Sequence, residues 1–112
     1  MPYKNIIYSK EKGIARIMIN RPEVRNALNQ PTRAEIRLAV RDIEQDNEVM
    51  VAIISGVGDK AFVAGADITE LKTATPMVIE ERASTVGQQL YTEIEKARVP
   101  VIAMISGFCL GG

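Results

Sequence analysis

The sequence predicts an α/β fold, and two stretches of the chain carry this prediction. An amphipathic helical pattern between Thr32 and Asp46 is followed directly by an apolar, largely β-branched run from Val49 to Ile54. A continuous apolar run behind a helix is typical of a parallel strand buried on both faces. A second long amphipathic pattern precedes another apolar run, Val101 to Ile105. Helices that alternate with buried strands indicate the α/β class.

The N-terminal part of the chain predicts a β-hairpin. Two β-rich runs, Asn5–Ser9 and Ile14–Ile19, are separated by a polar turn that ends in Gly13. Pro22 ends the second strand, because proline cannot donate a ladder hydrogen bond. A loop from Val24 to Gln30 then leads to the first helix.

The first helix is predicted to begin at a capping box formed by Thr32 and Glu35, with Pro31 tolerated at its entry. Its apolar residues fall on one face and its charges on the other. We expect this face to be buried, and it consists of Ile36, Ala39, Val40 and Ile43.

A second, longer helix is predicted from Thr75 to the residues before Val99 and Pro100, after a short helical turn over residues 69–72. Its apolar residues step by three or four positions and form a single stripe. They are Ile79, Ala83, Val86, Leu90, Ile94 and Ala97.

The composition limits the function that the chain can have. Its 112 residues suffice for one domain, and 46% of them are hydrophobic, as in globular proteins. Lys+Arg and Asp+Glu number 14 each, so neither a nucleic acid nor a membrane surface is expected as a partner. With no histidine and one cysteine, the usual zinc sites, Ser-His-Asp catalysis and disulfides are not expected. We expect a cytoplasmic protein, because no signal peptide or membrane-spanning run is visible. We also expect it to bind no metal, because histidine is absent.

Two small-residue loops follow the apolar runs, at the strand ends where ligands gather in α/β folds. In the first, Gly65 lets backbone approach a ligand, and Asp67 can cap the following helical turn, leaving the Ala66 N–H free. In the second, the pair Gly111–Gly112 can offer another backbone donor. Two converging N–H groups form an oxyanion hole. Glycine- and alanine-rich loops are, however, most often simply tight turns.

Three motifs resemble the enoyl-CoA hydratase (crotonase) family. Residues 21–28 resemble its R-P-x-x-x-N-A-L loop, residues 64–68 its A-G-A-D-I signature, and residues 106–112 its x-G-x-x-x-G-G-G stretch. The motifs occur in the family's order, and the resemblance covers nearly the whole chain, from Tyr3 to Gly112. The resemblance implies a crotonase-like (ClpP/crotonase) spiral of ββα units, two packed sheets, and a trimer or hexamer of the parent protein.

The resemblance also implies roles for individual residues. Ala66 and Gly112 would be the oxyanion-hole donors that hold the thioester carbonyl of an acyl-CoA substrate. The CoA itself would be contacted by residues of the first two motifs, namely Val24, Arg25, Ala27, Ala64, Asp67 and Ile68. CoA is part of the substrate, so no separate cofactor is expected.

The family's two catalytic glutamates have no counterpart in this chain. The first would lie a few positions beyond Gly112, so residues 1–112 are expected to be the N-terminal part of one crotonase-like domain, incomplete and lacking its C-terminal helices. Asp67 and Glu70 are poor substitutes, since they are expected to act as a cap and a solvated helix residue. Cys109 without a histidine is expected to be a buried thiol, and Lys60 could reach a CoA phosphate or be an ordinary surface lysine.

Enoyl-CoA hydratase is therefore the predicted activity, the reversible hydration of trans-2-enoyl-CoA to 3-hydroxyacyl-CoA in fatty acid or related acyl-CoA metabolism. A sister activity remains open: enoyl-CoA isomerase, dehalogenase, decarboxylase or thioester hydrolase. A third possibility is a non-catalytic CoA-binding chain, and we expect these 112 residues alone to be inactive.

Overall fold

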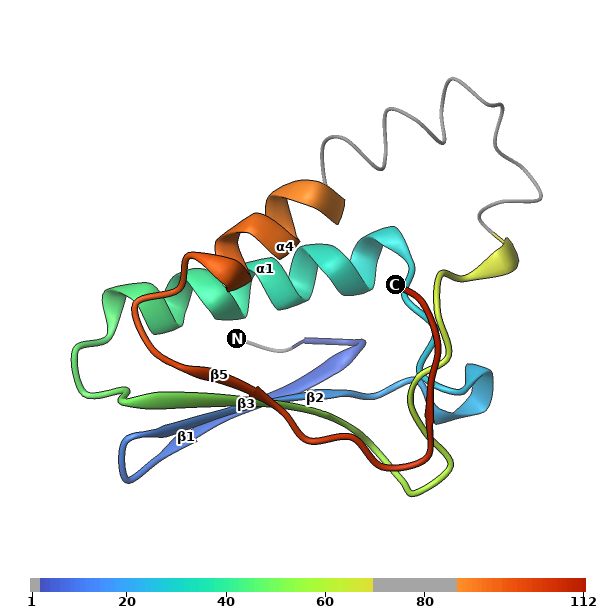
Figure 1. Ribbon diagram of the computed structural model, residues 1–112, viewed down its shortest axis with the longest axis horizontal. Coiled ribbons are helices and arrows are strands. Elements are labelled where there is room, and N and C mark those ends of the chain that lie inside the picture. The colour runs from blue at the N-terminus through green and yellow to red at the C-terminus, as the bar shows by residue number, and fades with distance from the viewer. Residues whose placement is uncertain (1–2, 70–86) are drawn as a thin grey trace.

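The computed structural model describes residues 3–69 and 87–112. Two helices lie side by side over one face of a sheet, as Figure 1 shows. In chain order the elements are β1 (Ile6–Glu11), β2 (Ile14–Ile19), the 3-10 helix η1 (Pro22–Val24), α1 (Gln30–Gln45), β3 (Val51–Gly56), β4 (Ala61–Val63), α4 (Gln88–Glu95), β5 (Val101–Ala103) and β6 (Phe108–Cys109).

The described strands form two sheets. The larger has the order β1-β2-β3-β5, with β1 and β2 antiparallel and the other neighbours parallel. The smaller consists of β4 and β6 in parallel. The pairs β3–β4 and β5–β6 therefore each add one strand to each sheet, which is how a spiral of ββα units is built.

The predicted hairpin is confirmed, with a tighter turn than expected. β1 continues to Glu11, so the turn consists of Lys12 and Gly13 alone. Both have positive φ, 51° and 81°. This is the backbone shape that two-residue hairpin turns require and that glycine favours.

Both apolar runs contribute strands, but the predictions that Val49–Ile54 is buried on both faces and that Val101–Ile105 is buried are wrong in the described structure. In β3 only Ala52 and Ser55 are buried, and the remaining residues are half-buried. β5 ends at Ala103, and Ile102 is 52% exposed. The reason for its exposure is that β5 lies at the edge of the described sheet, with β3 on one side and no described strand on the other.

The core lies between the larger sheet and the helices. Ile36, Ala39, Val40 and Ile43 of α1 are all buried, which confirms the predicted apolar face. They join buried residues of the hairpin and α4, chiefly Ile17, Ile19 and Leu90.

The predicted capping box of α1 is wrong. The helix begins at Gln30, and the side chain of Asn29 accepts the N–H of Thr32 at 2.9 Å. Glu35 does not reach back to the helix start, because its carboxylate accepts the backbone N–H groups of Lys4 and Asn5. Glu35 thus anchors the entry of β1 instead.

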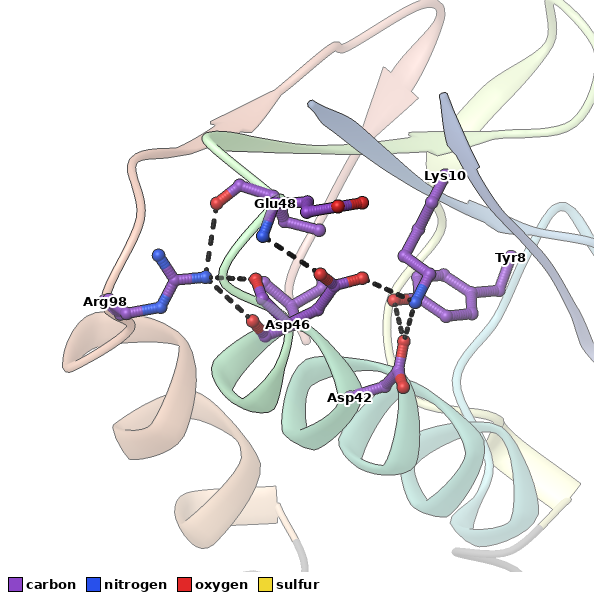
Figure 2. Close-up of polar contacts among 8 residues, drawn as sticks. Tyr8, Lys10, Asp42, Asp46, Glu48 and Arg98 are labelled. Atoms are coloured by element: carbon purple, nitrogen blue, oxygen red, sulfur yellow. Dashed lines mark hydrogen bonds and ion pairs between the residues drawn. The ribbon is translucent and has the colours of Figure 1, made fainter. Parts of the chain in front are cut away.

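A polar cluster fixes the C-terminal half of α1 to the hairpin (Figure 2). Asp42 accepts the hydroxyl of Tyr8 at 2.6 Å and the ammonium of Lys10 at 2.8 Å, and Asp46 accepts the same ammonium at 2.8 Å. The guanidinium of Arg98 donates to the carbonyls of Ile43, Asp46 and Val49. A cation at these carbonyls complements the negative end of the helix dipole.

The second predicted helix is described only in part. α4 covers Gln88–Glu95, with Leu90 buried and Ile94 packed against the core, as predicted. Arg37 of α1 donates to Glu93 at 2.9 Å and joins the two helices. Residues 70–86, which include Glu70 and the start of this predicted helix, lie outside the described residues. No helix in the described ranges is long and apolar enough to cross a membrane.

Candidate active site

Three backbone segments lie side by side at the carboxyl end of the sheets: Arg25–Leu28, Val63–Asp67 and Phe108–Gly112. The middle segment bonds to the first, since the N–H of Ala64 donates to the carbonyl of Arg25 at 3.1 Å and the N–H of Leu28 to that of Gly65 at 2.9 Å. It bonds to the third through Leu110, whose N–H donates to the carbonyl of Val63 at 3.0 Å. In Figure 1 the red C-terminal segment accordingly runs beside the yellow-green one. The three sequence motifs thus meet in one place.

The N–H of Ala66 points away from the first segment. Leu28 and Ala66 form a parallel bridge, in which Leu28 bonds to the flanking Gly65 and to Asp67, whose N–H donates to the Leu28 carbonyl at 2.8 Å. In such a bridge the N–H of the residue between faces the opposite edge. Within the described chain no acceptor takes this N–H, which leaves it available to a ligand.

Gly112 lies against this same residue. A Cβ added to Gly112 would come within 3.5 Å of the Ala66 nitrogen and 3.3 Å of the Gly65 carbonyl carbon. Its φ of +75°, like the +119° of Gly65, is a conformation that glycine adopts without strain. The structure therefore brings together the two residues that the sequence singled out as donors, and two glycines make this close approach possible.

Asp67 is a structural residue. Its Oδ1 accepts both the N–H and the hydroxyl of Thr69, at 3.0 and 2.6 Å, so the predicted cap is confirmed. Its Oδ2 lies 3.1 Å from Nη1 of Arg21. These hydrogen bonds hold the pKa of Asp67 below its ordinary value, and those from Thr69 have a larger effect than the one from Arg21. Both oxygens of the carboxylate are thus used in contacts that hold the loop containing Ala66.

Sequence reasoning gives no role to Asn26, which lies at the centre of the first motif. Its side chain is 1% exposed; its oxygen accepts the N–H of Arg21 at 2.9 Å, and its nitrogen donates to the carbonyls of Ala61 and Val57 at 2.8 and 3.2 Å. Its φ of 58° is left-handed, a region where asparagine is enriched. The one sequence signal for this structural role is an asparagine in a predicted loop. Two of its three hydrogen-bond partners, however, lie 31 and 35 residues away in the sequence.

The residues expected to contact CoA are spread around this place. Val24 and Arg25 are exposed at the end of η1, and Ile68 is exposed beyond the loop. Ala64 is half-buried, as is Ala27, whose carbonyl accepts Nη1 of Arg21 at 2.6 Å. The contacts of these residues with CoA stay a prediction.

A cavity of about 250 Å³ adjoins the first motif, and Arg25, Lys60 and Asp59 are the charged residues in its wall. Lys60 is exposed, as expected for a surface lysine. The Arg25 guanidinium stands 5.7 Å from the ring centroid of Phe108, so β6 helps to position it.

A second, apolar cavity of about 180 Å³ lies beside the glycine pair. Gly111, Gly112 and Cys109 line it on one side, and Tyr91 and Leu90 of α4 on another. Cys109 is exposed, so the prediction of a buried thiol is wrong. The reason is that β6 is paired on one side only within the described sheet.

No cluster of side chains able to hold a metal ion occurs among residues 3–69 and 87–112.

Comparison with known proteins identifies the family. The sequence model of the enoyl-CoA hydratase/isomerase family matches residues 9–112. The chain is 46% identical over 112 residues to crotonyl-CoA hydratase of Syntrophomonas wolfei, covering 100% of this chain and 43% of the relative. It is 42% identical over 113 residues to short-chain-enoyl-CoA hydratase of Clostridium acetobutylicum, covering 100% of this chain and 42% of that one. The chain thus spans less than half the length of these relatives.

Solved structures agree. An enoyl-CoA hydratase/carnithine racemase from Magnetospirillum magneticum superimposes with a TM-score of 0.91 at 34% identity, over 96% of this chain and 41% of that one. The enoyl-CoA hydratase from Bacillus anthracis gives a TM-score of 0.88 at 28% identity, over 93% of this chain and 40% of that one. The crotonase-like α/β fold expected from the motifs is therefore confirmed for the part of the fold that this chain covers, and the chain belongs to the enoyl-CoA hydratase/isomerase family.

Proposed function

We propose that this chain supplies the thioester-binding part of an enoyl-CoA hydratase, with the N–H groups of Ala66 and Gly112 as the oxyanion hole. One observation carries the proposal: Gly112 lies against Ala66, whose N–H has no acceptor in the described structure. Two donors side by side suit an oxygen that gains negative charge.

The chemistry needs such a site. Water adds to C3 of a trans-2-enoyl thioester, and the electron pair of the double bond moves through C2 onto the carbonyl oxygen as an enolate. Protonation at C2 then restores the carbonyl and gives 3-hydroxyacyl-CoA. Donors aimed at the enolate oxygen lower the barrier, and removal of one typically costs about 10²–10³ in rate.

The acid-base groups must come from elsewhere. A base has to take a proton from water, and an acid has to deliver one to C2. The chain has no histidine, and Asp67 is held by Arg21 and Thr69. We therefore propose that the glutamates expected from the family lie outside residues 1–112, which form the N-terminal part of one domain. The polypeptide alone is then expected to bind acyl-CoA without turning it over.

The two cavities suggest how the substrate lies. The two cations Arg25 and Lys60 in the wall of the larger cavity suit the phosphates of CoA, and the apolar cavity beside Gly112 suits an acyl chain. A small apolar cavity favours a short chain, in keeping with the names of the two relatives. Fatty acid β-oxidation in the cytoplasm is the proposed setting, and a trimer or hexamer the proposed assembly.

The test compares adjacent glycines. A Cβ on Gly112 would press on Gly65 at 3.3 Å, whereas one on Gly111 would meet nothing within 4 Å. The variants Gly112→Ala and Gly111→Ala are made in this chain joined to the C-terminal part of the Syntrophomonas hydratase. Hydration of crotonyl-CoA is followed by the loss of its enoyl absorbance. We expect kcat to fall about 10²–10³-fold for Gly112→Ala and to change little for Gly111→Ala. Equal rates for both variants would overturn the proposed oxyanion hole.

A second activity is supported by the family's own description, which covers isomerases as well as hydratases. Isomerase and hydratase share the enolate and differ in the groups that move protons. A panel of 2-enoyl-CoA and 3-enoyl-CoA substrates, given to the same hybrid protein, separates the two activities. Turnover of 3-enoyl-CoA with no hydration would favour the isomerase.

A further inference from the structure

We infer that Tyr91 is a positioning residue for the Gly112 donor, an inference that rests on the function proposed above. The Tyr91 hydroxyl donates a hydrogen bond to the main-chain carboxyl oxygen of Gly112, the last residue of the sequence. Tyr91 belongs to α4, and its side chain lies in the wall of the apolar cavity beside the glycine pair. The contact therefore joins a helix packed on the core to Gly112, whose N–H is the proposed donor.

The glycine pair needs such a contact. Glycine has no side chain to pack and the widest choice of backbone conformation, so it loses the most freedom on being fixed. The N–H of Leu110, donated to Val63 at 3.0 Å, is the last backbone hydrogen bond of the described chain before the pair. Beyond Leu110, Tyr91 gives the only hydrogen bond to the pair that the described structure shows.

The two contacts bracket the proposed donor. Leu110 is held on one side and the main-chain carboxyl oxygen of Gly112 on the other, and the Gly112 N–H lies between them. With both ends held, the backbone that carries this N–H is fixed beside Ala66. Tyr91 touches no reacting atom in this arrangement and acts through Gly112.

The choice of tyrosine fits this role. The ring supplies apolar surface to a cavity wall shared with Leu90 and Ile94, while the hydroxyl bonds to backbone at its rim. Tyr91 is 40% exposed, so removal of its hydroxyl leaves no buried polar group of α4 without a hydrogen-bond partner. Tyr91→Phe is accordingly expected to keep the fold and to change the aim of Gly112.

The test measures carbonyl polarisation without turnover. Butyryl-CoA labelled with ¹³C at the thioester carbonyl is bound to this chain, alone and joined to the C-terminal part of the Syntrophomonas hydratase. Two converging donors should move its resonance downfield on binding. For Tyr91→Phe we expect at least half of this displacement to be lost, with Kd changed by less than about threefold. In the joined protein kcat for crotonyl-CoA should fall about tenfold with KM nearly unchanged.

A matched variant controls for the loss of a phenol hydroxyl. Tyr8→Phe removes the bond to Asp42, which lies in the cluster at the other end of α1 (Figure 2). It should leave the displacement and kcat as in the unaltered protein. A Tyr91→Phe protein with the full displacement and kcat would overturn the inference and leave the oxyanion hole standing. If the unaltered protein produces no displacement in either form, the proposed function itself fails, and the inference with it.

Discussion

The guanidinium of Arg21 lies 3.1 Å from the carboxylate of Asp67, and this pair joins loops that are 46 residues apart. Both side chains are nearly buried, at 13% and 9% exposed. The same Nη1 also donates to the carbonyl of Ala27 at 2.6 Å. One cation therefore ties the first motif to the loop that presents Ala66.

Replacement of Asp67 by asparagine should destabilise the protein. The asparagine side chain keeps the size and a cap oxygen for Thr69 but leaves the Arg21 charge without its partner. We expect a loss of about 1–3 kcal/mol in the free energy of unfolding at pH 7, measured by urea denaturation. A change within experimental error would show that solvent already satisfies Arg21.

The stabilisation by Asp67 should depend on pH with a definite sign. The pKa of Asp67 in the folded chain is below its ordinary value of 3.8. The folded state thus holds the ionised form more tightly, so this contribution is complete above pH 3.8 and is lost as pH falls through the lower folded pKa. Urea denaturation across this range should show the difference between the unaltered protein and Asp67→Asn shrinking toward acid. A difference that grows toward acid would contradict this assignment.

Gly107→Ala should be among the most damaging single changes. A Cβ there would lie 2.2 Å from the carbonyl oxygen of Lys60, and the φ of +81° is unfavourable for alanine. Backbone would have to move, and the β4–β6 pairing that carries Gly112 would open. We expect a loss of more than about 2 kcal/mol by urea denaturation, with weaker butyryl-CoA binding by calorimetry.

Gly58→Ala is the matched control for Gly107→Ala. Gly58 has a similar φ of +87°, but a Cβ there would meet nothing within 4 Å. It should cost only the left-handed strain, about 1–2 kcal/mol, and leave binding intact. Equal losses at both positions would mean that backbone strain, not the contact with Lys60, dominates.

The sequence is a good guide to features that depend on local pattern. The apolar face of α1, the hairpin and the Asp67 cap each depend on residues that lie close together in the sequence. β4 and β6 lie where the sequence predicts loops, because they are three and two residues long and their pairing depends on Gly107 admitting the Lys60 carbonyl.

The capping-box error and the omission of Asn26 share one physical cause. Thr32 and Glu35 fit a capping box, yet Asn29 caps the helix and Glu35 is drawn to the start of β1. Sequence reasoning misses Asn26 because two of its partners lie 31 and 35 residues away. Tertiary hydrogen bonds of Glu35 and Asn26 decide both outcomes, and a single sequence does not display these partners.

Asn26 should tolerate no common substitution. Asn26→Asp keeps the acceptor for the Arg21 N–H but turns an oxygen toward the carbonyls of Ala61 and Val57, where Asn26 donates. Asn26→Gly suits the φ of 58° but removes all three hydrogen bonds. We expect losses of roughly 2–4 kcal/mol for both, measured by thermal denaturation. A mild Asn26→Gly variant would show that the backbone conformation, and not the side chain, matters there.

Arg25 should contribute to binding of the nucleotide part of CoA and not of the acyl part. Its guanidinium lies over Phe108, and Arg25 and Lys60 line the same cavity of about 250 Å³. An exposed cation gains modestly from a phosphate, so Arg25→Ala should weaken butyryl-CoA binding about two- to fivefold and reduce its sensitivity to salt. S-butyryl pantetheine, which carries no phosphate, should bind both proteins equally.

Arg16→Ala, which removes the same charge from the exposed side of β2, is the control and should change neither affinity. If Arg25→Ala weakens binding of both ligands alike, its effect is on the shape of the loop and the phosphate assignment is wrong.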